Sequence, residues 1–425
     1  MRIDFPYYQG MSCLDIPDAN LIGVVSPLSH AEALPPDTLI KSAFERPIKC
    51  RPISALARKA KKVLILTDDY TRKTPVREIL FHLLRELCVG GIEADDISIL
   101  VASGTHRQMT DAEMLSKFGK EVLSKYRVSS HNWRDEESLV DFGVTQSGVP
   151  VRLNRAVRSA DLIIGIGQIA PHRIAGFSGG GKIIQPGISG PESAAEIHWH
   201  SAMIDGGQIL GVAENPIRHE IEEVAARAGI TAIANAVCDG SGKVVGMFVG
   251  DPVQAHRAGA RLAREVYGVR IKERPDILVI DSYPMDGELW QAAKALYAAE
   301  LIMKQGGVTI LITPCQEGVS RSHPLILVEG YRKAAETIRL VEEGRISDKM
   351  VASHLVRVGR VIRDKGTGIL VSQGIGSEKA EKLGFRYGRT PQEALNIAFE
   401  IAGRAASVLV VRQGGTVLPI VEGGD

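Results

Sequence analysis

Four of the eleven histidines, His106, His172, His198 and His200, lie within the first half of this chain. The unperturbed pKa of histidine lets it act as a general acid or base near neutral pH, and its neutral imidazole is a common metal ligand. A single loop histidine is more often structural, but catalytic groups gather on loops that a rigid sheet holds in place. The grouping therefore favours a functional site, with acid–base work and metal ligation both open.

His198 and His200 are separated by one residue in the segment H-W-H. Side chains at positions i and i+2 point the same way only in an extended stretch. The third and fourth ligands of a closed zinc site are not found close by. One histidine supplying a single bond to a metal that something else already holds fits the pattern better, and either His198 or His200 could be that ligand.

The segment Pro171–Gly190, PHRIAGFSGGGKIIQPGISG, follows an apolar run at 161–169 that we expect to be a buried strand. Gly176–Lys182 has the G-x-x-x-x-G-K spacing of a phosphate-binding loop. However, Ile183 occupies the place of the hydroxyl that would hold magnesium, and Pro186 prevents an uninterrupted helix from following. The glycines would let backbone amides approach a ligand closely, with Lys182 beside it. A flexible linker is the alternative interpretation.

Three apolar runs in the first half each end in a polar loop. The runs at 63–66, 95–102 and 161–169 lead into Asp69–Arg72, Thr105–Arg107 and the glycine-rich loop. Helices are predicted after the first two loops, one with Thr74 as its N-cap and one with a capping box of Thr110 and Glu113. Strands that alternate with helices predict parallel sheets, and ligands collect at the carboxyl ends of such strands. We therefore expect the three loops to converge.

The same alternation restarts after the polar run at 269–275, with strands predicted at 277–281 and 308–313. The predicted fold class is thus α/β, with two α/β domains of mostly parallel sheets around an interdomain cleft. We expect an N-terminal domain over 1–268, a smaller C-terminal domain over 269–411 that closes the cleft, and residues 412–425 packing back on the first domain.

Three residues of the second domain could serve a substrate. On the helix predicted over 288–304, Trp290 and Lys294 share a face and Gln291 joins Lys294 at the i+3 spacing. A solvated amphipathic helix is the alternative. In the first domain, Arg72 could clamp a carboxylate with two hydrogen bonds. If the helix faces the first domain, a small anion would lie between two cations.

Composition excludes several classes of protein. The 425 residues have a net charge of +1, which gives no reason to expect nucleic acid as a partner. No run approaches eighteen apolar residues and the N-terminus does not resemble a signal peptide, so we expect a cytoplasmic protein without a membrane partner. The five cysteines are scattered and never form C-x-x-C pairs, which predicts reduced thiols.

Several motifs in order resemble the nickel-pincer nucleotide-dependent lactate racemase family. They are D-D-Y-T-R ending at Arg72, G-T-H-R at Gly104–Arg107, the glycine-rich loop, His198, and Gln291 with Lys294. The resemblance implies two α/β domains around a cleft that holds the cofactor, nickel pyridinium-3,5-bisthiocarboxylic acid mononucleotide. It also implies covalent attachment of this nucleotide at Lys182 and a bond from His198 to the nickel.

The resemblance implies further roles, residue by residue. His106 and His172 match the two catalytic acid/bases. The residues that match cofactor contacts or substrate contacts are Asp69, Tyr70, Thr71 and Arg72 for the cofactor, and Arg72, Gln291 and Lys294, with Trp290 beside them, for the substrate.

The activity implied is that of an isomerase, a racemase or epimerase of lactate or a related 2-hydroxy acid. Hydride would leave C2 and return to its other face, and each histidine would take the hydroxyl proton of one enantiomer. The expected partners are the small-molecule 2-hydroxy acid and, as one option, a second copy in a homodimer. Two alternatives stay open: a nucleotide-dependent phosphotransferase using Gly176–Lys182, and a non-catalytic binder of hydroxy acids.

Overall fold

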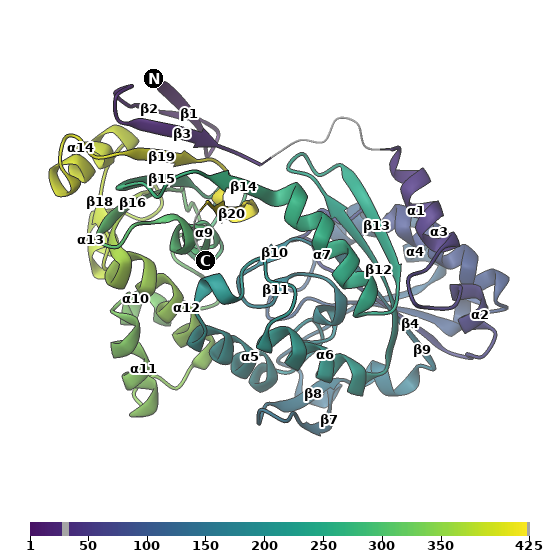
Figure 1. Ribbon diagram of the computed structural model, residues 1–425. Helices are drawn as coiled ribbons and strands as arrows, with labels where there is room; N and C mark the ends of the chain where they lie inside the picture. The colour runs from purple at the N-terminus through teal and green to yellow at the C-terminus, as the bar shows by residue number, and fades with distance from the viewer. Residues whose placement is uncertain (28–33, 423–425) are drawn as a thin grey trace. The chain divides into compact units, whose positions relative to one another are not determined.

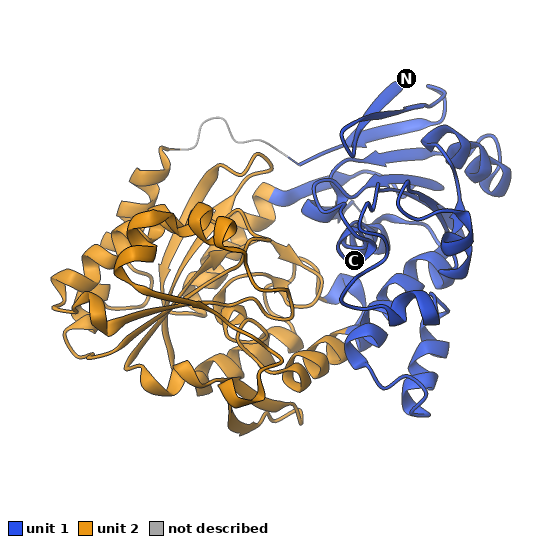
Figure 2. Cartoon of the chain, turned by 180° about the vertical axis from the view of Figure 1, so that it is seen from behind, with its two compact units in different colours: residues 1–27, 202–208, 267–425 blue, residues 28–201, 209–266 orange. Residues whose placement is uncertain are grey.

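The structure, a computed structural model, describes residues 1–27 and 34–422. The chain forms two compact units (Figure 2). Unit 1 comprises residues 1–27, 202–208 and 267–425, and unit 2 comprises residues 28–201 and 209–266. Each unit contains a six-stranded, mostly parallel sheet with helices packed on it, so the predicted α/β class is confirmed. None of the helices in the described ranges is long and apolar enough to cross a membrane.

The division into units differs from the predicted domains. The chain returns to unit 1 at Tyr267, next to the expected boundary, but residues 1–27 and 202–208 also belong to unit 1. Residues 412–422 belong to unit 1 too, where β20 (Leu418–Val421) pairs in parallel with β14 (Gly268–Ile271). These pairings join segments far apart in sequence, which local patterns do not reveal.

The sheet of unit 2 has the strand order β13-β12-β9-β4-β5-β6 (Figure 1). All neighbours are parallel except β12 and β13, which form an antiparallel pair. The strands are β4 (Val63–Thr67), β5 (Ile97–Val101), β6 (Arg127–Ser130), β9 (Leu162–Gln168), β12 (Ile230–Cys238) and β13 (Val244–Gly250). Every residue of β4 is buried, which is typical of a parallel sheet covered on both faces.

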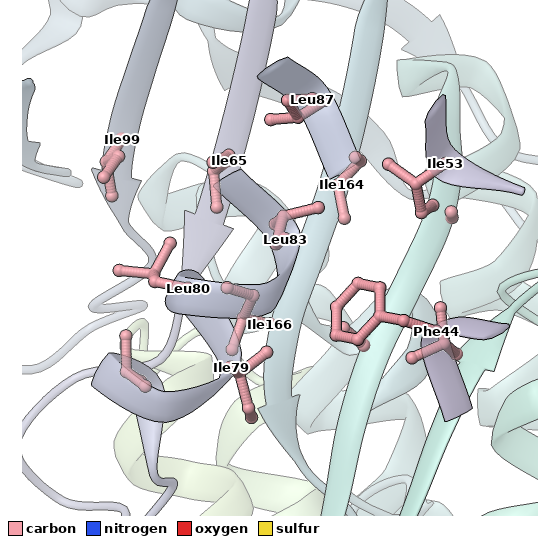
Figure 3. Close-up of a cluster of buried hydrophobic side chains, with 14 of the residues drawn as sticks. Phe44, Ile53, Ile65, Ile79, Leu80, Leu83, Leu87, Ile99, Ile164 and Ile166 are labelled. Atoms are coloured by element: carbon pink, nitrogen blue, oxygen red, sulfur yellow. The ribbon is translucent and has the colours of Figure 1, made fainter. Parts of the chain in front are cut away.

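Alternate residues of β4 enter two different cores. Ile65 belongs to the core cluster that also contains Leu83 of α3 (Val76–Val89) and Phe44 of α1 (Pro36–Glu45), all labelled in Figure 3. Leu64 packs on the other face with Val224 of α6 (Pro216–Ala228). Burial of one such side chain contributes about 1.5–3 kcal/mol. The remaining helices of unit 2 are α2 (Ile53–Ala57), α4 (Asp111–Lys125), α5 (Pro191–Met203) and α7 (Gln254–Tyr267), and its small strand pairs are β7 (Leu139–Val144) with β8 (Pro150–Asn154) and β10 (Pro171–His172) with β11 (Gly176–Phe177).

Two predicted helix starts have different outcomes. The capping box of Thr110 and Glu113 at the start of α4 is present in full. At α3 the expected N-cap is wrong: the helix begins at Val76, and the Thr74 hydroxyl donates to the Asp68 carboxylate instead. A tertiary hydrogen bond has taken the hydroxyl that a cap would use.

The sheet of unit 1 has the order β18-β17-β16-β15-β19-β3 with all strands parallel. They are β3 (Leu21–Val25), β15 (Ile277–Asp281), β16 (Gly307–Ile312), β17 (Gly366–Val371), β18 (Arg386–Tyr387) and β19 (Val408–Val411), and an antiparallel hairpin of β1 (Arg2–Tyr7) and β2 (Gly10–Asp15) precedes them. The helices are α8 (Leu289–Ala292), α9 (Lys294–Ile302), α10 (Leu325–Glu329), α11 (Ala334–Glu342), α12 (Lys349–Gly359), α13 (Ser377–Lys382) and α14 (Pro391–Ala402).

Each sheet reverses its strand order once. In unit 2 the reversal lies between β4 and β9, and in unit 1 it lies between β15 and β19. Ligands of open α/β sheets bind in the crevice beyond the carboxyl ends of the strands at such a switch point. The D-D-Y-T-R loop follows β4, the glycine-rich loop follows β9, and α8 and α9 follow β15. The candidate residues of both units therefore lie where this rule expects ligands.

Candidate active site

Three loops that follow strands of unit 2 are hydrogen-bonded to one another. Oδ2 of Asp69, after β4, lies 2.7 Å from Nδ1 of His106, after β5. The Gly104 N–H donates to the carbonyl of Gly187 in the glycine-rich loop at 2.9 Å. That loop returns to the sheet through the Ser178 hydroxyl, which donates to the last carbonyl of β9 at 2.7 Å. The three loops predicted to converge do so.

Asp69 fixes the tautomer of His106. A carboxylate only accepts hydrogen bonds, so Nδ1 of His106 carries the proton and Nε2 carries the lone pair. The other oxygen of Asp69, Oδ1, accepts from the N–H of Thr71 at 3.0 Å and from its hydroxyl at 2.6 Å. Burial alone would raise the pKa of Asp69, but the hydrogen bonds from His106 and Thr71 and the charge of Arg72 hold that pKa well below its usual range. His106 thus presents a basic nitrogen.

The other residues of the D-D-Y-T-R loop are also engaged within unit 2. The Tyr70 ring, partly exposed, lies under the guanidinium of Arg107 at 4.0 Å. Arg107 in turn donates to both carboxylate oxygens of Glu113, at 2.7 and 2.8 Å. Arg107 is therefore already committed, which makes it a poor candidate for binding a second carboxylate or the cofactor phosphate. Arg72, two residues after Tyr70, is partly exposed.

His172 has the opposite tautomer in its neutral form. Its Nδ1 accepts from the Ile174 N–H at 3.3 Å, which places the ring proton on Nε2. The residue lies in β10, which pairs with β11 at the entrance of the glycine-rich loop. The two histidines predicted as acid/bases thus differ in which nitrogen carries the proton: Nε2 is basic in His106 and protonated in His172.

The glycines of the loop allow it to pack against unit 2 itself. Gly176 has φ +76°, and a Cβ there would lie 1.9 Å from the carbonyl oxygen of Val212. Gly180 has φ +60°, and its Cβ would lie 3.0 Å from the His256 ring. The absence of a side chain at Gly176 and Gly180 therefore has a cause within unit 2. They are needed because the loop passes close to other backbone and side chains.

A buried arginine holds the loop from inside. The Arg218 guanidinium donates to the carbonyls of Ala175, at 3.0 and 3.2 Å, and Gly179, at 3.1 Å, and also to that of Phe177. Burial lowers the pKa of Arg218 to about 10, and nearby carboxylates only partly offset this. The loop therefore lies over a fixed positive charge.

Lys182 lies in a single 3₁₀ turn, Gly180–Ile183, within this loop. Loss of hydration and the charges of Arg72 and Arg218 lower its pKa to about 7, and the charge of Asp69 opposes them only in part. A lysine amine is a nucleophile only in its neutral form. Near neutral pH a large fraction of Lys182 is therefore able to form a covalent bond, whereas a phosphate-binding lysine would need its charge.

α5 carries both His198 and His200, so the H-W-H segment is helical and its histidines point in different directions. Nδ1 of His198 lies 2.6 Å from the carbonyl of Ala194 and donates to it, so Nε2 carries the lone pair that a metal would use. His200 instead pairs with the Glu220 carboxylate at 3.4 Å. Among residues 1–27 and 34–422, no three His, Cys, Asp or Glu side chains are grouped to hold a metal. His198 is thus better suited than His200 to complete the coordination of a metal held by another group.

In unit 1, Gln291 and Lys294 are in contact, as their spacing predicts. Nζ of Lys294 donates to Oε1 of Gln291 at 2.6 Å. Lys294 is the first residue of α9, which follows α8 directly. Both side chains are partly exposed. This pair has the charge and position to bind a carboxylate.

Trp290 stacks on two imidazole rings. Its ring stacks on His323 at 4.1 Å and on His354 at 4.6 Å between centroids. Burial lowers the pKa of His354 to about 3, so this ring is neutral, and its Nε2 is hydrogen-bonded to the Tyr331 hydroxyl at 2.9 Å. The indole beside Gln291 is therefore fixed in place, which a solvated amphipathic helix would not require.

Comparison with known proteins identifies the family. Residues 7–210 match the lactate racemase N-terminal domain, and residues 272–419 match the lactate racemase C-terminal domain. The lactate racemase of Thermoanaerobacterium thermosaccharolyticum is 30% identical over 427 residues, which cover 98% of this chain and 99% of that protein. The chain belongs to the lactate racemase family. The predicted family and isomerase class are thereby confirmed.

A second lactate racemase and two solved structures are also similar to this chain. The lactate racemase of Lactiplantibacillus plantarum is 29% identical, covering 97% of this chain and 98% of its own. The structure of the lactate racemase apoprotein from T. thermosaccharolyticum superposes with a TM-score of 0.89 at 28% identity, over 99% of this chain and 100% of that one. A Thermotoga maritima protein shares the fold with a TM-score of 0.73 at 23% identity, over 91% of this chain and 98% of its own.

Several contacts that shape the site were not predicted from the sequence. Asp69 is predicted as a cofactor contact, whereas the structure shows it bonded to His106. Their positions after neighbouring strands were the one available signal. Arg218 and the two rings around Trp290 come from distant segments and follow no motif. Their roles depend on tertiary packing.

Proposed function

We propose that this protein racemises a small 2-hydroxy acid, with lactate as the first substrate to test. One observation supports this most directly: the Asp69–His106 pair, which presents a basic imidazole nitrogen at the same sheet edge as the amine of Lys182. A hydroxyl proton needs such a base within hydrogen-bond reach. His172 would supply the matching acid in its imidazolium form, because the N–H of a neutral imidazole is too weak an acid.

The residues fit the family's cofactor. The neutral amine of Lys182 suits a bond to a carbonyl or thiocarbonyl carbon of a pyridinium-3,5-bisthiocarboxylic acid mononucleotide. Nε2 of His198 suits nickel as a single protein ligand. When bound, this nucleotide would supply the acceptor and donor for the C2 hydride, chemistry that no side chain can perform. We propose Lys182 as its attachment point and Asp69–Arg72 as the loop beside it.

The residues of this chain would bind the substrate and transfer its hydroxyl proton. Arg72 and Lys294 would bind the carboxylate, with Gln291 orienting Lys294. His106 would take the hydroxyl proton of one enantiomer through Nε2. On the other face of the substrate, His172 would return a proton to the same oxygen. For the second enantiomer neutral His172 would take the proton, which requires its lone pair on Nε2 in place of Nδ1, and His106 would return one as the imidazolium. The Trp290 ring, fixed by its neighbours, would limit the size of the substituent at C2.

The test is to produce the protein together with the enzymes that make the nucleotide. We expect a mass increase at Lys182, one nickel per chain, and conversion of either pure lactate enantiomer into the mixture by chiral chromatography. Absence of the mass increase and of racemisation, with tight binding of ATP and magnesium, would instead support the phosphotransferase. Ile183 is buried with Ile184 in the core, which disfavours that alternative.

A cytoplasmic location and a homodimer are proposals too. Cell fractionation would test the location, and light scattering would test the oligomeric state.

A further inference from the structure

Side chains on one face of α4 form hydrogen bonds with both loops that carry the Asp69–His106 pair. Glu113 and Lys117 are four residues apart, so they share a helical face. Glu113 binds Arg107, the neighbour of His106, through two hydrogen bonds. Lys117 reaches the D-D-Y-T-R loop on the other side. The helix thus contacts the base and its carboxylate partner through separate loops.

Lys117 makes three contacts to the D-D-Y-T-R loop. Its Nζ lies 2.8 Å from Oδ1 of Asp68 and donates to the carbonyls of Asp69, at 2.8 Å, and Arg72, at 3.4 Å. Only 8% of the Lys117 side chain is exposed. The loop thus surrounds the ammonium with one carboxylate and two carbonyl oxygens. Arg72 and Asp69, the proposed carboxylate ligand and the partner of His106, are both fixed by it.

A kink in α4 follows directly after Lys117 and Phe118. The helix is kinked at Gly119, whose φ of +78° and ψ of +159° are not helical. A Cβ at Gly119 would also lie 3.0 Å from the Arg77 guanidinium. Within the first part of α4, Phe118 is the buried hydrophobic residue and Lys117 precedes it. The capping box at its start and the side chains of Lys117 and Phe118 therefore set the direction of this short segment of α4.

We propose that Lys117 is a positioning residue for the acid–base step, acting through the D-D-Y-T-R loop on His106 and Arg72. The proposal rests on the function proposed above. Lys117 touches neither substrate nor reacting atoms in this scheme. Its ammonium contacts the Asp68 carboxylate and the carbonyls of Asp69 and Arg72, so that Oδ2 of Asp69 keeps Nδ1 of His106 protonated and Nε2 stays basic.

The test compares Lys117→Met with Lys120→Met, which removes an exposed lysine from the same helix. In the loaded enzyme we expect kcat of Lys117→Met to fall about 10- to 100-fold, since small misplacements of catalytic groups cost rates of this order. The mass increase at Lys182 should stay complete. Lys120→Met should match the unmodified chain in both measurements.

A second readout does not depend on activity. Nitrogen NMR of the ¹⁵N-histidine-labelled protein without cofactor reports which ring nitrogen of His106 is protonated, with His106→Gln to assign the signal. We expect the Nδ1–H form in the unmodified chain and a mixture of tautomers in Lys117→Met. An unchanged tautomer together with an unchanged kcat would overturn the proposal. If the unmodified chain shows no racemisation, the proposed function fails, and the tautomer comparison still decides the role of Lys117.

Loss of folding in Lys117→Met would be recognised by its melting temperature. In that case Lys117→Gln, which keeps one N–H donor toward the loop, is measured by the same two readouts. A mixed tautomer with reduced kcat supports the proposal, and values equal to those of Lys120→Met reject it.

Discussion

The Asp69 carboxylate divides its two oxygens between Thr71 and His106: Oδ1 accepts both donors of Thr71, and Oδ2 lies 2.7 Å from Nδ1 of the imidazole. In Asp69→Asn, the donors of Thr71 would retain the amide oxygen and leave the amide NH₂ facing His106. The ring would then carry its proton on Nε2, which is the wrong nitrogen for a base. We expect kcat to fall about 100-fold or more, as when other carboxylates that orient a catalytic histidine are replaced.

Chiral chromatography with each lactate enantiomer measures this change, and the mass of Lys182 shows whether the cofactor is still attached. Arg107→Lys serves as the control at the neighbouring loop, since it leaves both oxygens of Asp69 unaltered. Activity of Asp69→Asn close to that of the unmodified chain would show that the carboxylate does not set the tautomer.

Lys182 should react with acylating reagents at a lower pH than the other lysines. Its pKa of about 7 means that the neutral, reactive amine becomes the main form above pH 7, whereas an ordinary lysine reaches that point above pH 10. Labelling of the cofactor-free protein with acetic anhydride between pH 6 and 9, read by peptide mass, should show a midpoint near pH 7 at Lys182. The exposed Lys120 provides the reference, and equal profiles for the two lysines would contradict the prediction.

His198→Ala and His200→Ala should separate metal binding from helix structure. His198 donates from Nδ1 to Ala194, which leaves Nε2 as the ligand atom, whereas His200 is engaged with Glu220. We expect His198→Ala to lose at least 10-fold in nickel content by metal analysis while keeping the mass increase at Lys182. His200→Ala should retain nickel. The reverse result would transfer the ligand role to His200.

Unit 1 should lose stability on acidification because of His354. Its folded pKa of about 3 lies below the value of 6.5 expected in the unfolded chain, so between these values the unfolded state binds more protons. Stability therefore falls as pH decreases from about 6.5 toward 3, by up to about 2 kcal/mol between pH 6.5 and 5 from this group alone. Urea unfolding at pH 7 and pH 5 should show a smaller pH effect in His354→Phe. The same pH effect in both proteins would exclude His354 as the cause.

Trp290→Ala should widen the range of substrates. The indole is fixed by His323 and His354 beside Gln291, so its removal leaves space that the two rings do not fill by a simple rotation. Relative to lactate, kcat/KM for a hydroxy acid with a longer C2 substituent should rise about 10-fold, a difference typical of one or two methylene groups. Trp133→Ala, outside the site, is the control. An unchanged ratio would place Trp290 away from the substituent.

Much of the site could be predicted because it lies on short segments that follow strands. The polar loops after β4, β5 and β9 are visible in sequence as titratable residues after apolar runs, and parallel pairing brings them together. The tautomers could not be predicted. They depend on single contacts, such as Asp69 with His106 and Ala194 with His198, whose geometry is set by packing. The wrong N-cap at Thr74 has the same cause, since its hydroxyl is used by Asp68.

The domain boundaries could not be predicted for a different reason. Alternation of strands and helices locates elements but does not say which distant strand completes a sheet. β3 lies near the N-terminus and pairs with β19 near the C-terminus, so residues 1–27 join the unit formed mainly by the second half. Nothing in the composition of Leu21–Val25 distinguishes it from a strand of unit 2.

The pairing of β3 with β19 also determines the order in which the chain can be completed during synthesis. Residues 28–266 contain every strand of the unit 2 sheet, so that sheet can form while the second half is still being made. β3 has no parallel neighbour until residues 408–411 leave the ribosome, on the order of tens of seconds later at ordinary translation speeds. During this interval the first 27 residues must avoid other partners, and chaperones that bind nascent chains have their clearest opportunity there.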